Sequence, residues 1–310
     1  MNTQSNAMAQ SSLESQMLAP AAISATQRMY WSVRRELWEN PSIYVAPLAV
    51  GGFSFFAVLL GIFHLPEKMR ATAGLDPMKQ HDAITQPYDF VAALVMATAM
   101  IVGVFYCLDA LYGERRDRSV LFWKSLPVSD VTTVLAKASI PLVFLPLFGF
   151  AITVATQLMV LLLSSAVLGA SGQSVATLWT HLYLFRTSLL LLYHLLTIHG
   201  LWWAPLWCWL LLVSAWARRA PILWAFLPPF ALCYLEKIAF NTTHFIALLR
   251  YRFAGNGMEA VTAPGTMPMN PMTHITPGQF LISPGLWIGL AVAAIFLAAA
   301  VRLRRYQGPI

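Results

Sequence analysis

Long apolar stretches recur along the chain, and most of them carry no charged residue. A helix needs about 20 apolar residues to cross the hydrocarbon core of a bilayer, which is about 30 Å thick. Six stretches are long enough, and we expect spans at about 43–63, 90–111, 138–168, 190–216, 221–240 and 285–303. The pattern therefore predicts an all-α membrane protein with six transmembrane helices in residues 41–310.

The fourth stretch allows two interpretations. Its first part, residues 182–196, either belongs to the span or forms an interfacial helix that precedes a shorter membrane segment. The expected number of spans is six in both cases.

Composition supports lipid as the main solvent of the chain. Hydrophobic residues make up 58% and charged residues 11%, whereas a soluble domain carries about 25% charged residues. This excludes an ordinary soluble globule. Cys107, Cys208 and Cys233 lie in apolar stretches without the spacing of a metal or redox site, so we expect them to act as small buried apolar groups. Residues 1–27, which lack Lys and Arg, are expected to be a disordered lead.

The distribution of cations predicts the orientation. Cytoplasmic loops of membrane proteins carry an excess of Lys and Arg. With the N-terminus inside, thirteen of the twenty cations fall on the cytoplasmic side: Arg28, Arg34, Arg35, Arg115, Arg116, Arg118, Lys124, Lys137, Arg218, Arg219, Arg302, Arg304 and Arg305. We therefore expect both termini in the cytoplasm and the protein in the cell inner (plasma) membrane. The net charge of +7 then reflects topology and a partner surface, and we expect no nucleic-acid partner.

Residues 28–40 precede the first span and have an amphipathic pattern. A helix here places Tyr30, Val33 and Leu37 on one face and Arg34, Arg35 and Glu39 around the other. Apolar residues opposite cations are typical of a helix that lies in the membrane interface. The alternative is a plain cytoplasmic extension of the first span.

Residues 112–132 form the most distinctive polar segment. A short helix is expected to be capped by Asp117 or Ser119 and to end at Leu126, because a residue before proline disfavours the helical conformation. Ser129 can then cap the next helix. Phe122 and the neighbouring Trp123 lie among cations and have no membrane core to fill. Such aromatic residues are typical anchors in a partner's pocket, although they can also rest on lipid headgroups.

This segment resembles the cytoplasmic loop between the second and third spans of ABC-2 type permeases, the membrane subunits of ABC exporters. Glu114-Arg115 and Pro127-Val128-Ser129 match the family's motifs at the same separation, and residues 134–137 resemble its later apolar step with a Lys. Between the motifs, residues 118–121 replace the family's Gly-Thr-Leu-Glu.

The resemblance implies a type V exporter-like architecture and a permease that forms the translocation pathway as a dimer, with itself or with a paralogue. It also implies two copies of a separate ATPase subunit, which carry ATP and Mg, so we expect this chain to be no enzyme and to bind no cofactor. No Gly in the sequence is followed by Lys, so a phosphate-binding GxxxxGK[ST] loop is absent. The ATPase-docking residues implied are Glu114, Arg115, Arg116, Asp117, Arg118, Phe122, Trp123, Lys124 and Pro127.

Ionisable residues inside membrane segments are candidates for function. Glu236 interrupts the fifth span and, with His244 in the outer loop 241–284, is a candidate for the pathway; alternatively the span ends there, with Glu236 at the interface. His194 and His199 lie five residues apart, about 140° around an α-helix, so we expect no shared metal or haem site. We also expect no metal at Met267 and its neighbours in the outer loop.

Two other classes of function remain open. An integral membrane enzyme, such as a lipid or acyl transferase, needs a catalytic constellation near the interface, and the sequence contains no nucleophile elbow or acidic metal cluster. A secondary transporter commonly shows inverted repeats or several intramembrane carboxylates. An ATPase partner with vanadate-sensitive turnover distinguishes the exporter from both.

Overall fold

The computed structural model of the chain describes residues 24–72, 74–126, 128–182, 184–254 and 277–310. Within these residues the regular structure is helical throughout. Six helices are long and apolar enough to cross a membrane: Ser42–Thr72, Lys79–Arg116, Asp130–Ala170, Leu178–Trp202, Pro221–Phe240 and Pro284–Tyr306. The prediction of an all-α, multi-pass membrane protein is confirmed at this level.

The helices follow one another with short connections. The first half contains α2 (Ala25–Glu39), α3 (Ser42–Gly61), η1 (Ile62–His64), α4 (Leu65–Thr72), α5 (Pro77–Ala110), α6 (Tyr112–Arg116), α7 (Ser119–Ser125), α8 (Asp130–Ser139) and η2 (Ile140–Phe144). The second half contains α9 (Leu145–Ala170), α10 (Ala176–Leu182), α11 (Leu184–His194), η3 (Leu195–Trp202), α12 (Ala204–Trp216), α13 (Pro221–Phe240), α14 (His244–Ala254), α15 (Pro277–Ile282) and α16 (Pro284–Tyr306).

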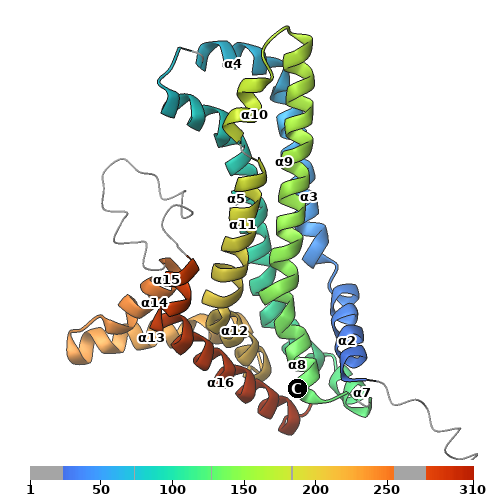
Figure 1. The fold of residues 1–310 in the computed structure, drawn as a ribbon. Coiled ribbons are helices and arrows are strands. Elements are labelled where there is room, and N and C mark those ends of the chain that lie inside the picture. The colour runs from blue at the N-terminus through green and yellow to red at the C-terminus, as the bar shows by residue number, and fades with distance from the viewer. Residues whose placement is uncertain (1–23, 73, 127, 183, 255–276) are drawn as a thin grey trace, which may run out of the picture.

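Helices α3, α5, α9 and α11 form a tall bundle (Figure 1). Close packing of α3 on α9 depends on Gly51, where an added Cβ would lie 2.8 Å from Ile152 Cγ2. Helices α4 and α10 lie at one end of the bundle, and α2, α7 and the start of α8 lie at the other. Helix α12 packs on α5 and α16, while α13 and α14 extend sideways from the bundle (Figure 1).

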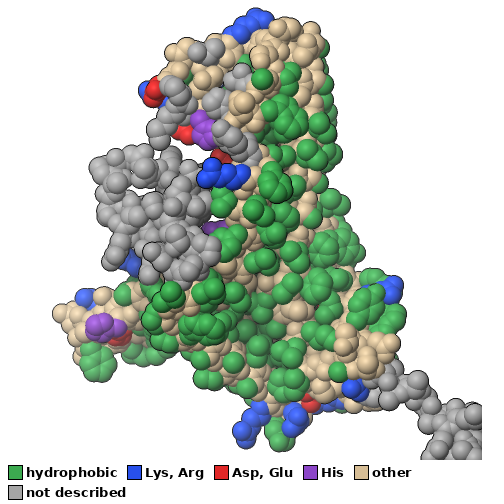
Figure 2. Space-filling model, in the orientation of Figure 1, with side chains coloured by type: hydrophobic (Ala, Val, Ile, Leu, Met, Phe, Trp, Pro, Cys, Tyr) green, Lys and Arg blue, Asp and Glu red, His purple; other side chains and the backbone are tan. Residues whose placement is uncertain are grey.

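The start of α2 and the C-terminus lie at the same end of the bundle, which we call the lower end (Figure 1). Figure 2 shows hydrophobic side chains over most of this face of the bundle, with Lys and Arg side chains gathered at the lower end. An apolar belt with cations beyond it is the arrangement that a membrane-spanning protein requires. That the lower end faces the cytoplasm stays a prediction.

Several helices are longer than their apolar stretches. Helix α5 begins at Pro77, so Asp89 lies within it, although the expected span begins at residue 90. The continuous helix Asp130–Ala170 has 41 residues and is about 61 Å long at 1.5 Å per residue. The bundle is therefore longer than the hydrocarbon core is thick, and its polar ends project beyond it.

The expected span at 190–216 is divided in the structure. Residues Leu195–Trp202 form the π-helix η3, the chain turns at Trp203, and α12 continues as a separate apolar helix. A second π-helix, η2, contacts η3. The two approach closely at Gly200, where an added Cβ would lie 3.0 Å from the carbonyl oxygen of Leu142.

The π-helix also corrects the expectation that His194 and His199 lie on different sides of a helix. Their rings form an edge-to-face pair with centroids 5.6 Å apart. The expectation assumed the α-helical repeat, whereas a π-helix bonds residue i to i+5 and so brings residues five apart onto one face. No group of three or more potential metal-ligating His, Cys, Asp or Glu side chains occurs in the described part of the chain.

Candidate functional site

The polar segment between the second and third spans folds as two short helices at the lower end. Helix α6 is fixed to α12 because the backbone N–H groups of Leu111 and Tyr112 both donate to Ser214 Oγ, at 3.0 and 2.9 Å. Arg118 then takes a left-handed conformation with φ 60°, and α7 begins after it. The expected cap by Asp117 or Ser119 is wrong, since Arg118 occupies that position and no side chain caps α7.

The other end of α7 agrees with the sequence. Leu126 is extended, with ψ 152°, and ends the helix. Ser129 Oγ accepts a 3.1 Å hydrogen bond from the backbone N–H of Thr132 and caps α8. A left-handed residue before α7 and an extended residue after it turn the helix out of line with both neighbouring spans.

Beneath α7 lies a buried group of charged side chains, which we call the ion cluster. It consists of Arg35, Glu36, Glu114, Asp130, Lys137 and Arg304. The three cations and three carboxylates balance in charge. Removing charges from water is costly unless they are paired with good geometry, and here each is paired.

Lys137 is the centre of the ion cluster. Its Nζ lies 2.9 Å from Glu36 Oε1 and 3.1 Å from Glu114 Oε1. Glu36 is fully buried and also accepts a 2.9 Å hydrogen bond from the hydroxyl of Tyr106, besides its contact with Arg35. The ammonium group thereby joins α8 to α2 and α6.

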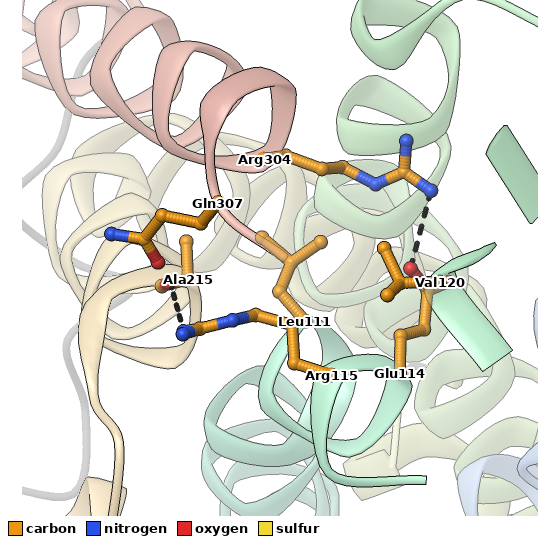
Figure 3. A pocket seen from close by; sticks show the side chains of 7 residues that line it. All are labelled: Leu111, Glu114, Arg115, Val120, Ala215, Arg304 and Gln307. Carbon is orange, nitrogen blue, oxygen red and sulfur yellow. Dashed lines mark hydrogen bonds and ion pairs between the residues drawn. The ribbon is translucent and has the colours of Figure 1, made fainter. Parts of the chain in front are cut away.

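Arg304 extends the ion cluster to the last helix. Its Nη2 lies 3.2 Å from Glu114 Oε2, and its Nη1 contacts Asp130 Oδ1. Figure 3 shows Glu114 and Arg304 pointing toward one another, while Arg115 points the other way, toward Ala215. The ion cluster thus holds the lower ends of α2, α6, α8 and α16 together.

Arg115 attaches the segment to α12 and to the C-terminal residues. Its Nη1 donates to the carbonyl oxygens of Ala215 and Ala217, at 2.6 and 3.2 Å, and its Nε donates to that of Gly308 at 3.3 Å. A cavity of about 10 Å³ remains between Arg115, Glu114 and Arg304 (Figure 3). This is room for about one water molecule.

The structure divides the expected docking residues into two groups. Glu114 and Arg115 are buried, and their charges are paired within the chain. The exposed residues are Arg116, Asp117, Arg118, Phe122 and Lys124. Pro127 lies outside the described residues.

The exposed residues of α7 and its flanks have defined contacts. The Phe122 side chain is 60% exposed. Trp123 is half-buried, with the Arg35 guanidinium 4.0 Å from its ring centroid, and Lys124 Nζ donates to the carbonyl oxygens of Arg305 and Gln307 at 3.3 and 3.1 Å. Arg116 pairs with Asp109 at 3.4 Å, as expected from the sequence.

Helix α2 has one face on the ion cluster and one face outside. Val33 and Glu36 are buried, whereas Tyr30, expected on the same face as Val33, is exposed together with Trp31 and Trp38. Aromatic residues exposed beside cations suit a membrane interface, in agreement with an interfacial helix.

Electrostatics favour the charged form of Glu36. Burial acts to raise the pKa of this carboxyl, but Lys137 and Arg35 outweigh burial and hold the pKa below its usual range. Burial likewise acts to lower the pKa of Arg35, and Glu36 outweighs it and raises that pKa. The two residues are therefore charged at neutral pH.

Acid is expected to weaken the ion cluster. A carboxyl with a depressed folded pKa contributes stability above its unfolded pKa, about 4.3 for Glu. This contribution is lost as the pH falls through the folded value. We therefore expect the free energy of unfolding in detergent to decrease below about pH 4, and to decrease less in Glu36→Gln. Equal pH slopes for the two proteins would contradict this role of Glu36.

Glu236 lies at the other candidate position, at the junction of α13 and α14. Its carboxylate accepts hydrogen bonds from the backbone N–H groups of His244 and Phe245, at 2.6 and 2.8 Å, and from the Thr242 hydroxyl at 2.8 Å. Lys237 bonds to Asn241 Oδ1 at 2.8 Å. The contacts of Glu236 are those of a cap on the first turn of α14.

Sequence reasoning missed four members of the ion cluster as site residues: Arg35, Glu36, Asp130 and Arg304. One local signal existed for Glu36, because it follows Val33 by three residues and so places a carboxylate on the apolar face of α2. Searches for similar proteins do not extend the assignment: no family model, no curated protein and no solved structure matches this chain.

Proposed function

We propose that the chain is the permease subunit of an ATP-driven ABC exporter of the ABC-2 type, which docks a separate ATPase subunit on α7. The observation that carries the proposal is the combination of an exposed aromatic anchor, Phe122, with a buried ion cluster directly behind it. A docking surface needs apolar anchors, and a surface that transmits force also needs a rigid support.

The outer face of α7 has the chemistry of a protein contact. Leu121 and Phe122 are both more than half exposed, and the cations Arg116, Arg118 and Lys124 surround them. Apolar anchors in a charged rim are typical of protein interfaces. An ATPase surface that complements this face offers an apolar pocket with acidic residues around it.

The ion cluster gives α7 a connection to the spans. Separating the partners of a buried ion pair costs about 3–5 kcal/mol, so the lower ends of the four helices move together. When ATP closes two ATPase subunits, their displacement of α7 passes through Glu114 to Lys137 and Arg304. Two permease chains then change between inward-open and outward-open states, as a shift of a two-state equilibrium.

Co-expression with the candidate ATPase tests the proposal. We expect the two chains to purify together from the cell inner membrane and the complex to show vanadate-sensitive ATP turnover. Purified permease with turnover of its own, or a complex whose ATPase rate equals that of the free ATPase, would contradict it. The second outcome would favour an integral membrane enzyme or a secondary transporter.

Replacing Glu236 separates its capping role from a role in the pathway. In Glu236→Gln we expect the amide hydrogens of His244 and Phe245 to exchange faster, because a neutral amide is a weaker acceptor for them. We expect export by the complex to continue. Lys237→Gln, one residue further along the same helix, is the matched control. Loss of export with unchanged exchange would assign Glu236 to the pathway.

A further inference from the structure

A cavity of about 210 Å³ lies at the upper end of the bundle, opposite the ion cluster. It is enclosed by the end of α3, η1, α4, the beginning of α5, α9 and α10. An apolar cavity of about 150 Å³ already holds a ligand of the size of benzene. This cavity therefore has room for several carbons of an alkyl chain.

The walls of the cavity are apolar. Its buried hydrophobic lining consists of Ile62, Ile84, Tyr88, Val160 and Leu178. The polar groups among them are already bonded, since the Thr72 hydroxyl donates to the Met69 carbonyl at 3.0 Å and the side chains of Tyr88 and Ser164 bond each other. The deep part of the cavity thus offers packing to an apolar chain and no free polar partner.

The mouth of the cavity is basic. His64 and Lys68 line it, both exposed, and they lie four residues apart on one side of the helical segment. No Asp or Glu is among the described residues that line the cavity. An ammonium group and an imidazole at the rim of an apolar cavity complement an anionic head attached to an apolar chain.

The level of the mouth fits such a ligand. Helix α3 has 20 residues and is about 30 Å long, which equals the thickness of the hydrocarbon core. His64 and Lys68 follow its end, so they lie at the level of the lipid headgroups. Val58, one turn before the end of α3, lines the cavity on the hydrocarbon side.

We propose that this cavity binds a fatty-acid carboxylate, with the alkyl chain between Ile62, Ile84 and Val160 and the carboxylate at Lys68 and His64. The volume accommodates one chain, whereas a phospholipid brings two. The site is separate from α7 and does not depend on the proposed docking of an ATPase.

Equilibrium binding of radiolabelled laurate to the full chain in phosphatidylcholine nanodiscs tests the site, with empty nanodiscs subtracted. We expect saturable binding that Lys68→Gln weakens about tenfold, since a hydrogen bond to a charged group contributes about 1.5 kcal/mol or more. Ala83→Phe, which fills the cavity from α5, should abolish it. Arg70→Gln, an exposed cation of the same helix that does not line the cavity, should change binding less than twofold.

Three results would overturn the proposal. One is laurate binding that is equal in the original chain, Lys68→Gln and Arg70→Gln. A second is equal binding of lauryl alcohol, which has the chain without the carboxylate. A third is displacement of laurate by phosphatidylglycerol in the nanodiscs at similar mole fractions, which would assign the site to phospholipid. The first two comparisons need only exposed-residue variants or the original chain, so a misfolded Ala83→Phe does not prevent the decision.

Discussion

Replacing Lys137 by Met is expected to lower the free energy of unfolding by about 3–5 kcal/mol, because it leaves buried carboxylates without their shared cation. The Lys137 ammonium lies within 3.1 Å of both Glu36 and Glu114. Met is apolar and of similar length, so the loss comes from charge and not from a cavity. Detergent-solubilised protein should show it as an earlier unfolding midpoint.

Two further variants make this result specific to the ion cluster. Arg116→Met removes an exposed cation of the same segment, and its effect should stay within about 0.5 kcal/mol, as for other exposed ion pairs. The double variant Lys137→Met, Glu36→Met should lose less than the sum of the single losses, because neither charge is then left alone. A loss below about 1 kcal/mol in Lys137→Met would contradict a structural role of the ion cluster.

Replacing Phe122 by Ala is expected to weaken ATPase binding by about 30-fold or more, which corresponds to the loss of about 2 kcal/mol or more at an interface hot spot. The folded permease should be unaffected, since the Phe122 side chain is 60% exposed. The measurement is titration of the purified permease with its ATPase, by binding and by stimulated ATP turnover.

The control is Phe105→Ala, which removes the same side chain from an exposed position of 61% on α5, within a span. It should leave ATPase binding unchanged. Trp123→Ala is a different test, because Trp123 also stacks on Arg35 and its loss disturbs the ion cluster. Equal affinity of Phe122→Ala and Phe105→Ala would show that Phe122 rests on lipid headgroups instead.

The hydrophobic pattern predicted the six spans because each depends on local composition alone. It did not predict how far helices continue past their apolar part. Asp89 ended the expected second span, whereas the structure continues the helix back to Pro77, at a level where polar residues cost nothing. The π-helix at Leu195–Trp202 has no proline within it to signal a break.

The candidate site was predictable only in its local parts. The end of α7 at Leu126 and the cap at Ser129 follow from residues next to them in the chain. The ion cluster does not, because Glu36 and Lys137 are 101 residues apart and Glu114 and Arg304 are 190 apart. Pairings over such separations depend on how the helices pack, and sequence spacing does not reveal them.

The inward direction of Glu114 and Arg115 changes the meaning of the motif they form. On sequence they belong to an exposed docking loop, whereas in the structure they attach that loop to Lys137, Arg304 and the end of α12. The exposed contact is left to Leu121 and Phe122. In our proposal the buried residues position α7, and the exposed residues meet the ATPase.

Photo-crosslinking from α7 tests the central claim most directly. Benzoylphenylalanine is placed at Phe122, with Phe105 as the matched lipid-facing control, and the permease is irradiated in membranes with its co-expressed ATPase. The proposal predicts an adduct with the ATPase from position 122 and none from position 105. Adducts from position 122 with lipid alone, while the ATPase is present and active, would contradict docking on α7.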